Sequence, residues 1–129
     1  MALKMVVYKR DIAQLFRELR AAQIYAEENL ACCSSCSIAE IEAHAPLNTG
    51  AVYYHEQDIE DAYDPKTGFL TKPLAIRYVF NYGPSLKDEK ELQEKETCAL
   101  AKTVIKIANE IGLITEWDGD IRKVIFVKP

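Results

Sequence analysis

The spacing of apolar residues changes along this chain, and that change limits the folds open to it. Between positions 74 and 81 every second residue is apolar, namely Leu74, Ile76, Tyr78 and Phe80. A period of two predicts a strand with one apolar face. Residues 91–111 instead repeat apolar side chains every three or four positions, which predicts the longest helix, and Gly112 follows as a stop signal.

Two capping boxes predict helices in the first third of the chain. Asp11 and Gln14 form the first box, and apolar residues recur behind it at helical spacing as far as Leu30. Ser37 and Glu40 form the second box, which predicts a short helix ending near residue 43.

The remaining segments predict strands, turns and one further short helix. Residues 51–55 are rich in strand formers, residues 57–63 are typical of an acidic helical turn, and residues 64–68 have the composition of a turn. Asp118-Gly119 then supplies the two residues of a hairpin turn. We therefore predict one α+β domain over residues 1–129, with a mainly antiparallel four-stranded sheet, two longer helices and two short ones.

The final hairpin is apolar on both faces when Trp117 is placed opposite Asp120. One face then carries Leu113, Val124 and Phe126, and the other carries Ile114, Ile121, Ile125 and Val127. A second covering surface is expected, either the first helix or another copy of the chain. The sequence leaves monomer and homodimer open.

Composition excludes several classes of partner. The 129 residues carry a net charge of −4, with no basic cluster of the kind that nucleic acid or anionic membrane requires. The apolar N-terminal stretch is too short for a signal-peptide core or a membrane span. We therefore expect a cytoplasmic protein with no nucleic-acid or membrane partner, whose four cysteines are thiols, metal ligands or a redox pair.

The most unusual segment holds Cys32, Cys33 and Cys36. Cys33 and Cys36 form a Cys-x-x-Cys pair, which in redox proteins lies at a helix N-terminus that stabilises the first thiolate. The capping box starts the helix at Ser37, so the pair is expected to precede it. The surroundings also lack a βαβ pattern and a nearby Lys or Arg, so a redox pair is disfavoured.

Zinc is the second interpretation of the cysteines and is not favoured either. A structural site needs four ligands, and the chain offers one knuckle, the additional thiol of Cys32, and His44 and His55 at unhelpful spacing. The simplest alternative is a tight bend between two helices in which the thiols pack as small hydrophobic groups. The cofactor is therefore unknown on sequence alone.

A second polar segment, His55-Glu-Gln-Asp58, lies where a strand gives way to a helical turn. A His with an Asp three positions later is suited to general-base chemistry or to binding a polar ligand. The acidic residues are equally consistent with a solvated first helical turn. Ser34, Ser35 and Ser37 belong to no Gly-x-Ser-x-Gly elbow, and Cys98 is expected in the core.

The order of these motifs resembles that of an uncharacterised bacterial family, a domain of unknown function. The resemblance spans about residues 15–127 and rests on four motifs: Cys32-Cys33-x-x-Cys36, His55-x-Gln57-Asp58, Tyr82-Gly83, and Gly112-Leu113 leading into Trp117-Asp118-Gly119. It implies no activity, but it marks the cysteine bend and the His55 segment as signature positions. The run from residue 64 to residue 72 is longer than the resemblance leads us to expect.

These observations leave three hypotheses of function. The first is a module that binds a small molecule or a protein at a site made of Cys32, Cys33, Cys36, His55 and Asp58. The second is a thiol-dependent enzyme in which Cys33 or Cys36 is the nucleophile and His55 the base. The third is a zinc-stabilised domain. Catalytic and metal-binding roles are otherwise unassigned, and the composite site requires that the thiols and the imidazole lie close together.

Overall fold

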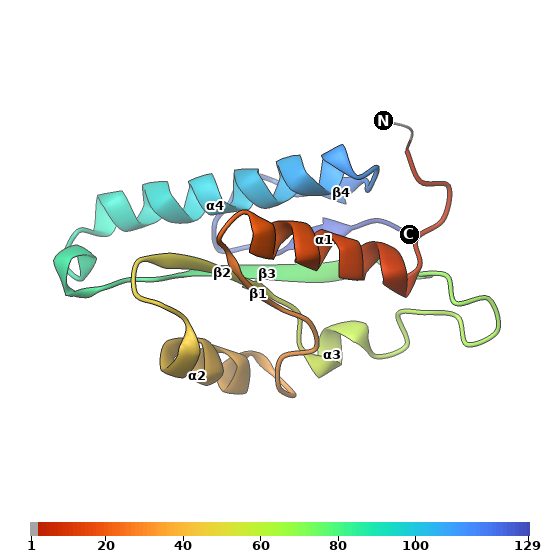
Figure 1. The fold of residues 1–129 in the computed structure, drawn as a ribbon, viewed down its shortest axis with the longest axis horizontal. Coiled ribbons are helices and arrows are strands. Elements are labelled where there is room, and N and C mark those ends of the chain that lie inside the picture. The colour runs from red at the N-terminus through yellow and green to blue at the C-terminus, as the bar shows by residue number, and fades with distance from the viewer. Residues whose placement is uncertain (1–2) are drawn as a thin grey trace.

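The structure, a computed structural model, describes residues 3–129 (Figure 1). Its elements in chain order are α1 (Lys9–Ala21), β1 (Tyr25–Glu27), α2 (Ser34–His44), β2 (Thr49–Tyr53), α3 (Glu56–Ile59), β3 (Leu74–Asn81), the 3-10 helix η1 (Pro84–Leu86), α4 (Lys90–Glu110), β4 (Thr115–Glu116) and β5 (Ile125–Val127). Within the described residues, no helix combines the length and the apolar character needed to cross a membrane.

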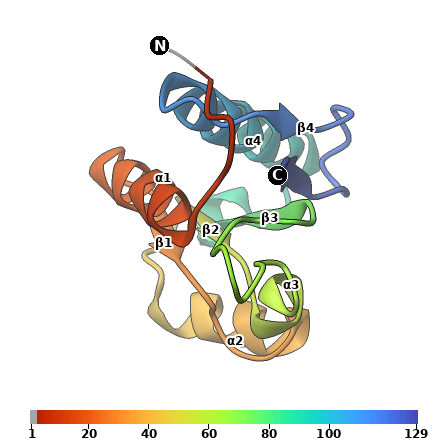
Figure 2. The same ribbon diagram turned by 90° about the vertical axis from the view of Figure 1, so that its right-hand side faces the viewer.

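A five-stranded mixed sheet divides the molecule into three layers. The strand order is β1-β2-β3-β5-β4, with β1 parallel to β2 and the other pairs antiparallel. Helices α1 and α4 cover one face, while α2 and α3 lie on the other (Figures 1 and 2). The α+β class is confirmed, but the prediction of four mainly antiparallel strands is wrong in detail because β1 was not foreseen.

The alternation of β3 explains the two layers of core. Leu74 and Ile76 point into the larger cluster, which α1 and α4 cover, whereas Val79 packs against the smaller cluster. The smaller cluster consists of Ile41, Ala45, Ala51 and Tyr53. The strand predicted over residues 74–81, the long helix and the turn at residues 64–68 are confirmed.

Helix α1 ends nine residues earlier than its apolar spacing predicts. The Gln23 N–H donates to the Arg20 carbonyl (3.0 Å) and the Ile24 N–H donates to the Leu19 carbonyl (3.1 Å), with Gln23 at φ 68°. This pair of bonds is the Schellman arrangement that closes a helix. Apolar residues beyond it therefore belong to β1 and the following turn, which is why Ala26 is buried without being helical.

Both predicted capping boxes start their helices at the wrong residue. Asp11 lies inside the first turn of α1, where its carboxylate accepts from the Tyr8 N–H at 2.8 Å. Ser37 likewise lies inside α2, because the helix has its N-cap at Cys33. The Ser37 hydroxyl donates to backbone carbonyls of the preceding turn and so does not cap the helix from outside.

The C-terminal hairpin has a different register from the one expected. Thr115 pairs with Val127 and Glu116 with Phe126, so residues 117–124 form a long connection in place of a two-residue turn. The Trp117 indole N–H donates to the Tyr78 hydroxyl at 2.9 Å, which fastens this connection to β3. Only one face of β5 is buried, since Phe126 is 38% exposed.

The end of α1 can be tested with the same substitution, glutamine to glycine, at two positions where we expect different effects on the free energy of unfolding. Gln23 is exposed at positive φ, where an L-residue carries a cost of about 1–2 kcal/mol that glycine avoids. Gln23→Gly should leave the free energy of unfolding unchanged or raise it by up to about 1 kcal/mol. The control Gln14→Gly, in the interior of α1, should lower it by about 1 kcal/mol. Urea unfolding measures both; equal losses would mean that position 23 is helical.

Candidate functional site

Three thiols gather where the chain turns from β1 into α2. The Cys32 sulfur lies 3.7 Å from the sulfur of Cys33 and 3.7 Å from that of Cys36. All three sulfurs lie within 4.8 Å of one another, and Cys32 and Cys36 are exposed. The cluster could therefore hold a metal ion, and its sulfurs are open to reagents from solvent.

The parallel pairing of β1 with β2 brings this turn beside His55. Strands that run parallel have their carboxyl ends at the same edge of the sheet. The segment after β1 carries the cysteines and the segment after β2 carries His55, so both begin at that edge. Two backbone bonds join them: Leu30 N–H to the Tyr54 carbonyl (2.8 Å) and Glu56 N–H to the Ala31 carbonyl (3.0 Å).

Local backbone geometry and Ser37 shape the cysteine turn. Asn29 (φ 50°) and Ala31 (φ 59°) both adopt the left-handed conformation, which turns the chain sharply. Ser37 is fully buried, and its hydroxyl donates to the Leu30 carbonyl and to the Cys33 carbonyl. These bonds hold the turn against the first turn of α2 without any contribution from the thiols.

The start of α2 makes the two members of the Cys-x-x-Cys pair unequal. The backbone N–H of Cys36, with help from the neighbouring thiols, lowers the pKa of the Cys33 thiol below its ordinary value. The hydrogen bond that Cys36 makes with the Cys32 thiol instead raises the pKa of Cys36 to about 11. Cys33 is thus the thiol most easily ionised of this pair.

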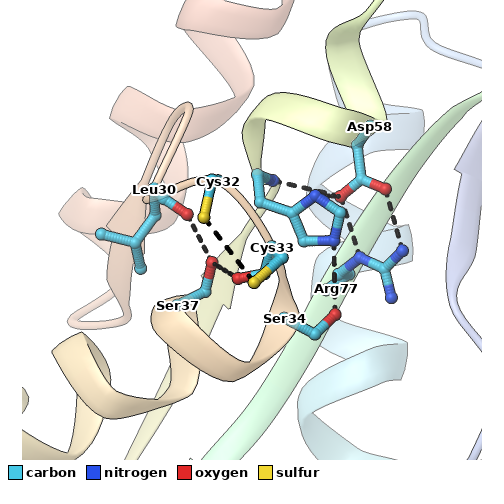
Figure 3. A network of polar contacts seen from close by, with 8 residues as sticks. Leu30, Cys32, Cys33, Ser34, Ser37, Asp58 and Arg77 are labelled. Atoms are coloured by element: carbon cyan, nitrogen blue, oxygen red, sulfur yellow. Dashed lines mark hydrogen bonds and ion pairs between the residues drawn. The ribbon is translucent and has the colours of Figure 1, made fainter.

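His55 and Asp58 form a buried pair that Arg77 completes. The two carboxylate oxygens of Asp58 accept from the Arg77 guanidinium at 2.8 and 2.9 Å, and one of them also accepts from the His55 backbone N–H at 3.1 Å. The imidazole Nδ1 of His55 lies 3.4 Å from the same carboxylate (Figure 3). His55 is only 3% exposed. The segment is therefore a fixed polar network, and the interpretation of Asp58 as part of a solvated face is wrong.

The other imidazole nitrogen faces the cysteine turn. His55 Nε2 lies 3.3 Å from the hydroxyl oxygen of Ser34, the first residue of α2 (Figure 3). Burial lowers the pKa of His55, the Asp58 carboxylate opposes that shift and the Arg77 charge adds to it. The lowered pKa favours the neutral imidazole at pH 7, and in the contact between Nε2 and Ser34 either group can be the donor, depending on the tautomer.

The structure brings most of the predicted site residues into one region. Ser34 follows Cys33 in the chain and its hydroxyl contacts the imidazole, so Ser34 links the cysteine turn to His55 (Figure 3). His44 lies at the opposite end of α2, where it pairs with Glu40 at 3.3 Å, and so it does not join them. Within residues 3–129 the candidate metal ligands are Cys32, Cys33 and Cys36, and neither of the histidines considered from the sequence belongs to this group.

The sequence analysis did not identify two residues of this region, Ser34 and Arg77, as members of the site. Ser34 matches no nucleophile motif, because its partner His55 is distant in sequence. Arg77 is the charged residue on the second face of β3, and its position opposite an acidic helical turn could have suggested a partner for Asp58. Cys98, expected in the core, is half-buried on α4.

Comparison with known proteins supports the expected resemblance. A family model described as Domain of unknown function (DUF6891) matches residues 10–129. No curated protein and no solved structure matches the chain. The match covers the cysteine cluster and the His55 segment together, and it assigns no role to either.

The unequal thiols predict an order of alkylation. In reduced, metal-free protein, iodoacetamide should modify Cys33 at lower pH than Cys36, because only the thiolate reacts and the pKa of Cys33 is lowered while that of Cys36 is raised. Mass spectrometry with fragment-level assignment identifies the first site modified at each pH. If Cys33 and Cys36 react equally, and only as the pH approaches about 8.5, the asymmetry is absent.

Proposed function

This chain belongs to the DUF6891 domain family, and we propose that it binds a thiophilic metal ion, with Zn²⁺ as the reference ion, through Cys32, Cys33 and Cys36. The observation that carries the proposal is the position of Cys32, whose sulfur lies 3.7 Å from each of the other two. A redox pair needs only two thiols, whereas a metal site uses a third at this position.

The sulfur separations agree with the size of a zinc–thiolate site. Zinc binds thiolate at about 2.3 Å in tetrahedral geometry, which places two ligand sulfurs about 3.8 Å apart. Two of the sulfur separations are already 3.7 Å. Only the third, between Cys33 and Cys36, which lies within 4.8 Å, would have to shorten for a metal ion to bind. Thiolates are the ligands that Zn²⁺ and Cu⁺ prefer among the protein side chains.

Three protein ligands leave one tetrahedral position open. Zinc sites of this kind take water, a small molecule or a group from another protein as the fourth ligand. Because Cys32 and Cys36 are exposed, such a ligand can approach from solvent. This proposal gives the predicted binding module a specific form, and the reduced thiols it needs agree with the expectation of a cytoplasmic protein.

The metal is proposed to serve binding and not folding. The bonds of Ser37, Leu30 and Ala31 hold the cysteine turn without using a thiol. Metal-free protein should therefore keep its far-ultraviolet circular dichroism, unlike a small zinc-dependent domain, which unfolds when chelated.

Metal titration of cysteine variants tests the site. Reduced protein should bind one Zn²⁺ in competition with a chromophoric chelator, and Cys32→Ser, Cys33→Ser and Cys36→Ser should each weaken binding by at least about 100-fold, because each removes a direct ligand. Cys98→Ser is the matched control and should bind as the wild type does. Co²⁺ substitution should give a thiolate charge-transfer band in the wild type and in the control.

Two results would contradict the metal site. One is a wild-type protein that leaves Zn²⁺ on the chelator while its thiols are fully reduced. The other is an affinity that the Cys32→Ser substitution leaves intact, since the proposal depends on that thiol.

Thiol–disulfide exchange is a second candidate, favoured by one specific observation. Helix α2 connects the parallel strands β1 and β2 and has Cys33 as its N-cap, so two of the three sequence arguments against a redox pair do not hold. The third, the lack of a nearby Lys or Arg in the sequence, still stands. The Cys33 thiolate would attack an external disulfide, releasing one thiolate. Cys36 would then attack the Cys33 sulfur, releasing the second thiolate and leaving a Cys33–Cys36 disulfide.

Trapping the intermediate separates exchange from metal binding. With hydroxyethyl disulfide, metal-free wild-type protein should lose two hydrogens. The double variant Cys32→Ser/Cys36→Ser should instead accumulate a mixed disulfide at Cys33, because neither neighbouring thiol is left for the second step. Intact mass and peptide mapping measure both products. Modification of Cys98 as fast as Cys33 would show ordinary thiol reactivity in place of a redox pair.

A further inference from the structure

Ser34, His55 and Asp58 form a continuous line of side chains that the metal proposal does not use. The Ser34 oxygen lies 3.3 Å from His55 Nε2, and His55 Nδ1 lies 3.4 Å from an Asp58 oxygen. Ser34 comes from α2, Asp58 from α3, and His55 immediately precedes α3. A hydroxyl, an imidazole and a carboxylate in this order are the parts of a nucleophile–base–orienting group. The buried Nδ1 makes no hydrogen bond within residues 3–129, so the contact with Asp58 has to tighten when substrate binds, as such contacts often do.

Ser34 also borders a space in which a substrate could lie. A cavity of about 200 Å³ adjoins it, and its wall combines polar side chains, among them Ser34, Tyr53, Arg77 and Lys123, with the apolar side chains of Ile38, Ile121 and Val124. Water occupies roughly 30 Å³ per molecule in the liquid, so the cavity holds a group of only a few heavy atoms. The three cysteines are not part of this lining, which makes it a separate site from the thiol cluster.

We propose that Ser34 is a nucleophile for acyl transfer, with His55 as its general base and Asp58 as a positioning residue, and that the cavity accepts a small ester or thioester carrying an anionic group. This goes beyond the proposed metal binding and does not depend on it. The expected anionic group follows from Lys123 in the cavity wall, because the other two cations of the wall are already paired, Arg77 with Asp58 and Arg122 with Asp120.

The proposed reaction needs no further reagent than substrate and water. The Ser34 oxygen adds to the substrate carbonyl carbon while His55 Nε2 takes its proton. The carbonyl-to-leaving-group bond then breaks, and His55 returns the proton to the departing alkoxide or thiolate. Water adds to the acyl-serine by the same steps, releasing the acid and restoring the hydroxyl.

Arg77 limits how strongly Asp58 can assist. Its guanidinium binds both carboxylate oxygens, so Asp58 stabilises a protonated imidazole less than a free carboxylate would. The ionisable groups whose charges interact in this network are Asp58 from α3, Arg77 from β3 and the Tyr53 phenol from β2. We therefore expect a base that is neutral at pH 7 and a slow acyl transfer.

Active-site labelling tests the assignment directly. Methanesulfonyl fluoride is a hard electrophile small enough for the cavity, and it modifies activated hydroxyls in preference to thiols. Wild-type protein should gain one adduct, which peptide mapping places on Ser34, and Ser34→Ala should gain none. Ser35→Ala, which removes the exposed neighbouring hydroxyl, is the matched control and should be labelled as fast as the wild type.

Two further variants separate catalysis from a structural role. His55→Gln should slow labelling by at least about 100-fold, the lower range for loss of a general base. Asp58→Asn should move the midpoint of the labelling pH profile downward, because the carboxylate raises the pKa of His55 and its loss removes that effect. Circular dichroism and Zn²⁺ titration of the same variants show whether the fold and the thiol site are intact.

Several outcomes would overturn the proposal. Folded wild-type protein that gains no adduct shows that Ser34 is not activated and that its contact with His55 only joins α2 to α3. Equal labelling of wild type and His55→Gln would show that His55 is not the general base. An adduct on Ser34→Ala would show that Ser34 is not the nucleophile. Because Zn²⁺ binding is measured separately, failure here leaves the metal site as it stands.

Discussion

The parallel pairing of β1 with β2 is the constraint on which the candidate site depends. Parallel neighbours cannot be joined by a tight turn, so the chain must cross over, and α2 makes that crossing. The crossing starts at the carboxyl end of β1, beside the carboxyl end of β2. Cysteines that follow one strand and an imidazole that follows the other are therefore placed together by topology, although Ser34 and His55 are 21 positions apart in the sequence.

A buried ion pair fixes the second half of the site. Asp58 has a side chain only 6% exposed and is held by Arg77 from the middle of β3. Loss of one partner from such a pair leaves an uncompensated buried charge, which is strongly destabilising. Helix α3 has a single turn, and Ile59 is the one apolar side chain of this turn that packs against the larger core cluster. The pair between Asp58 and Arg77 is therefore a main attachment of α3 to the sheet.

The two faces of the cysteine turn have different chemistry. On one side the three sulfurs are close together and open to solvent, which suits a soft metal ion or thiol exchange. On the other side Ser34 contacts a buried imidazole whose pKa is lowered by burial, beside a small cavity lined by both polar and apolar side chains. Cys33 and Ser34 are adjacent in the sequence but belong to different environments, because Cys33 is the N-cap of α2 and Ser34 is its first residue.

Local patterns in the sequence were enough to predict two elements, the strand β3 and the end of helix α4. Strand β3 follows from its period of two. The end of α4 follows from Gly112, which adopts the positive φ of 91° that a Schellman ending requires. The cysteine bend and the His55 segment were recognised as the unusual polar features, and the family match includes both.

Tertiary structure alone decided where α1 ends. Because α1 ends at Ala21, residues 25–27 can form β1, and β1 places the cysteine turn beside His55. Gln23 adopts at the end of α1 the same left-handed conformation as Gly112 does after α4, but glutamine gives no local sign of it. Helical spacing continued through Ala26 because a buried strand residue is as apolar as a buried helical one. Pairing of β1 with β2 supplies the backbone hydrogen bonds that replace further helix, and this long-range pairing leaves no trace in the spacing of residues along the chain.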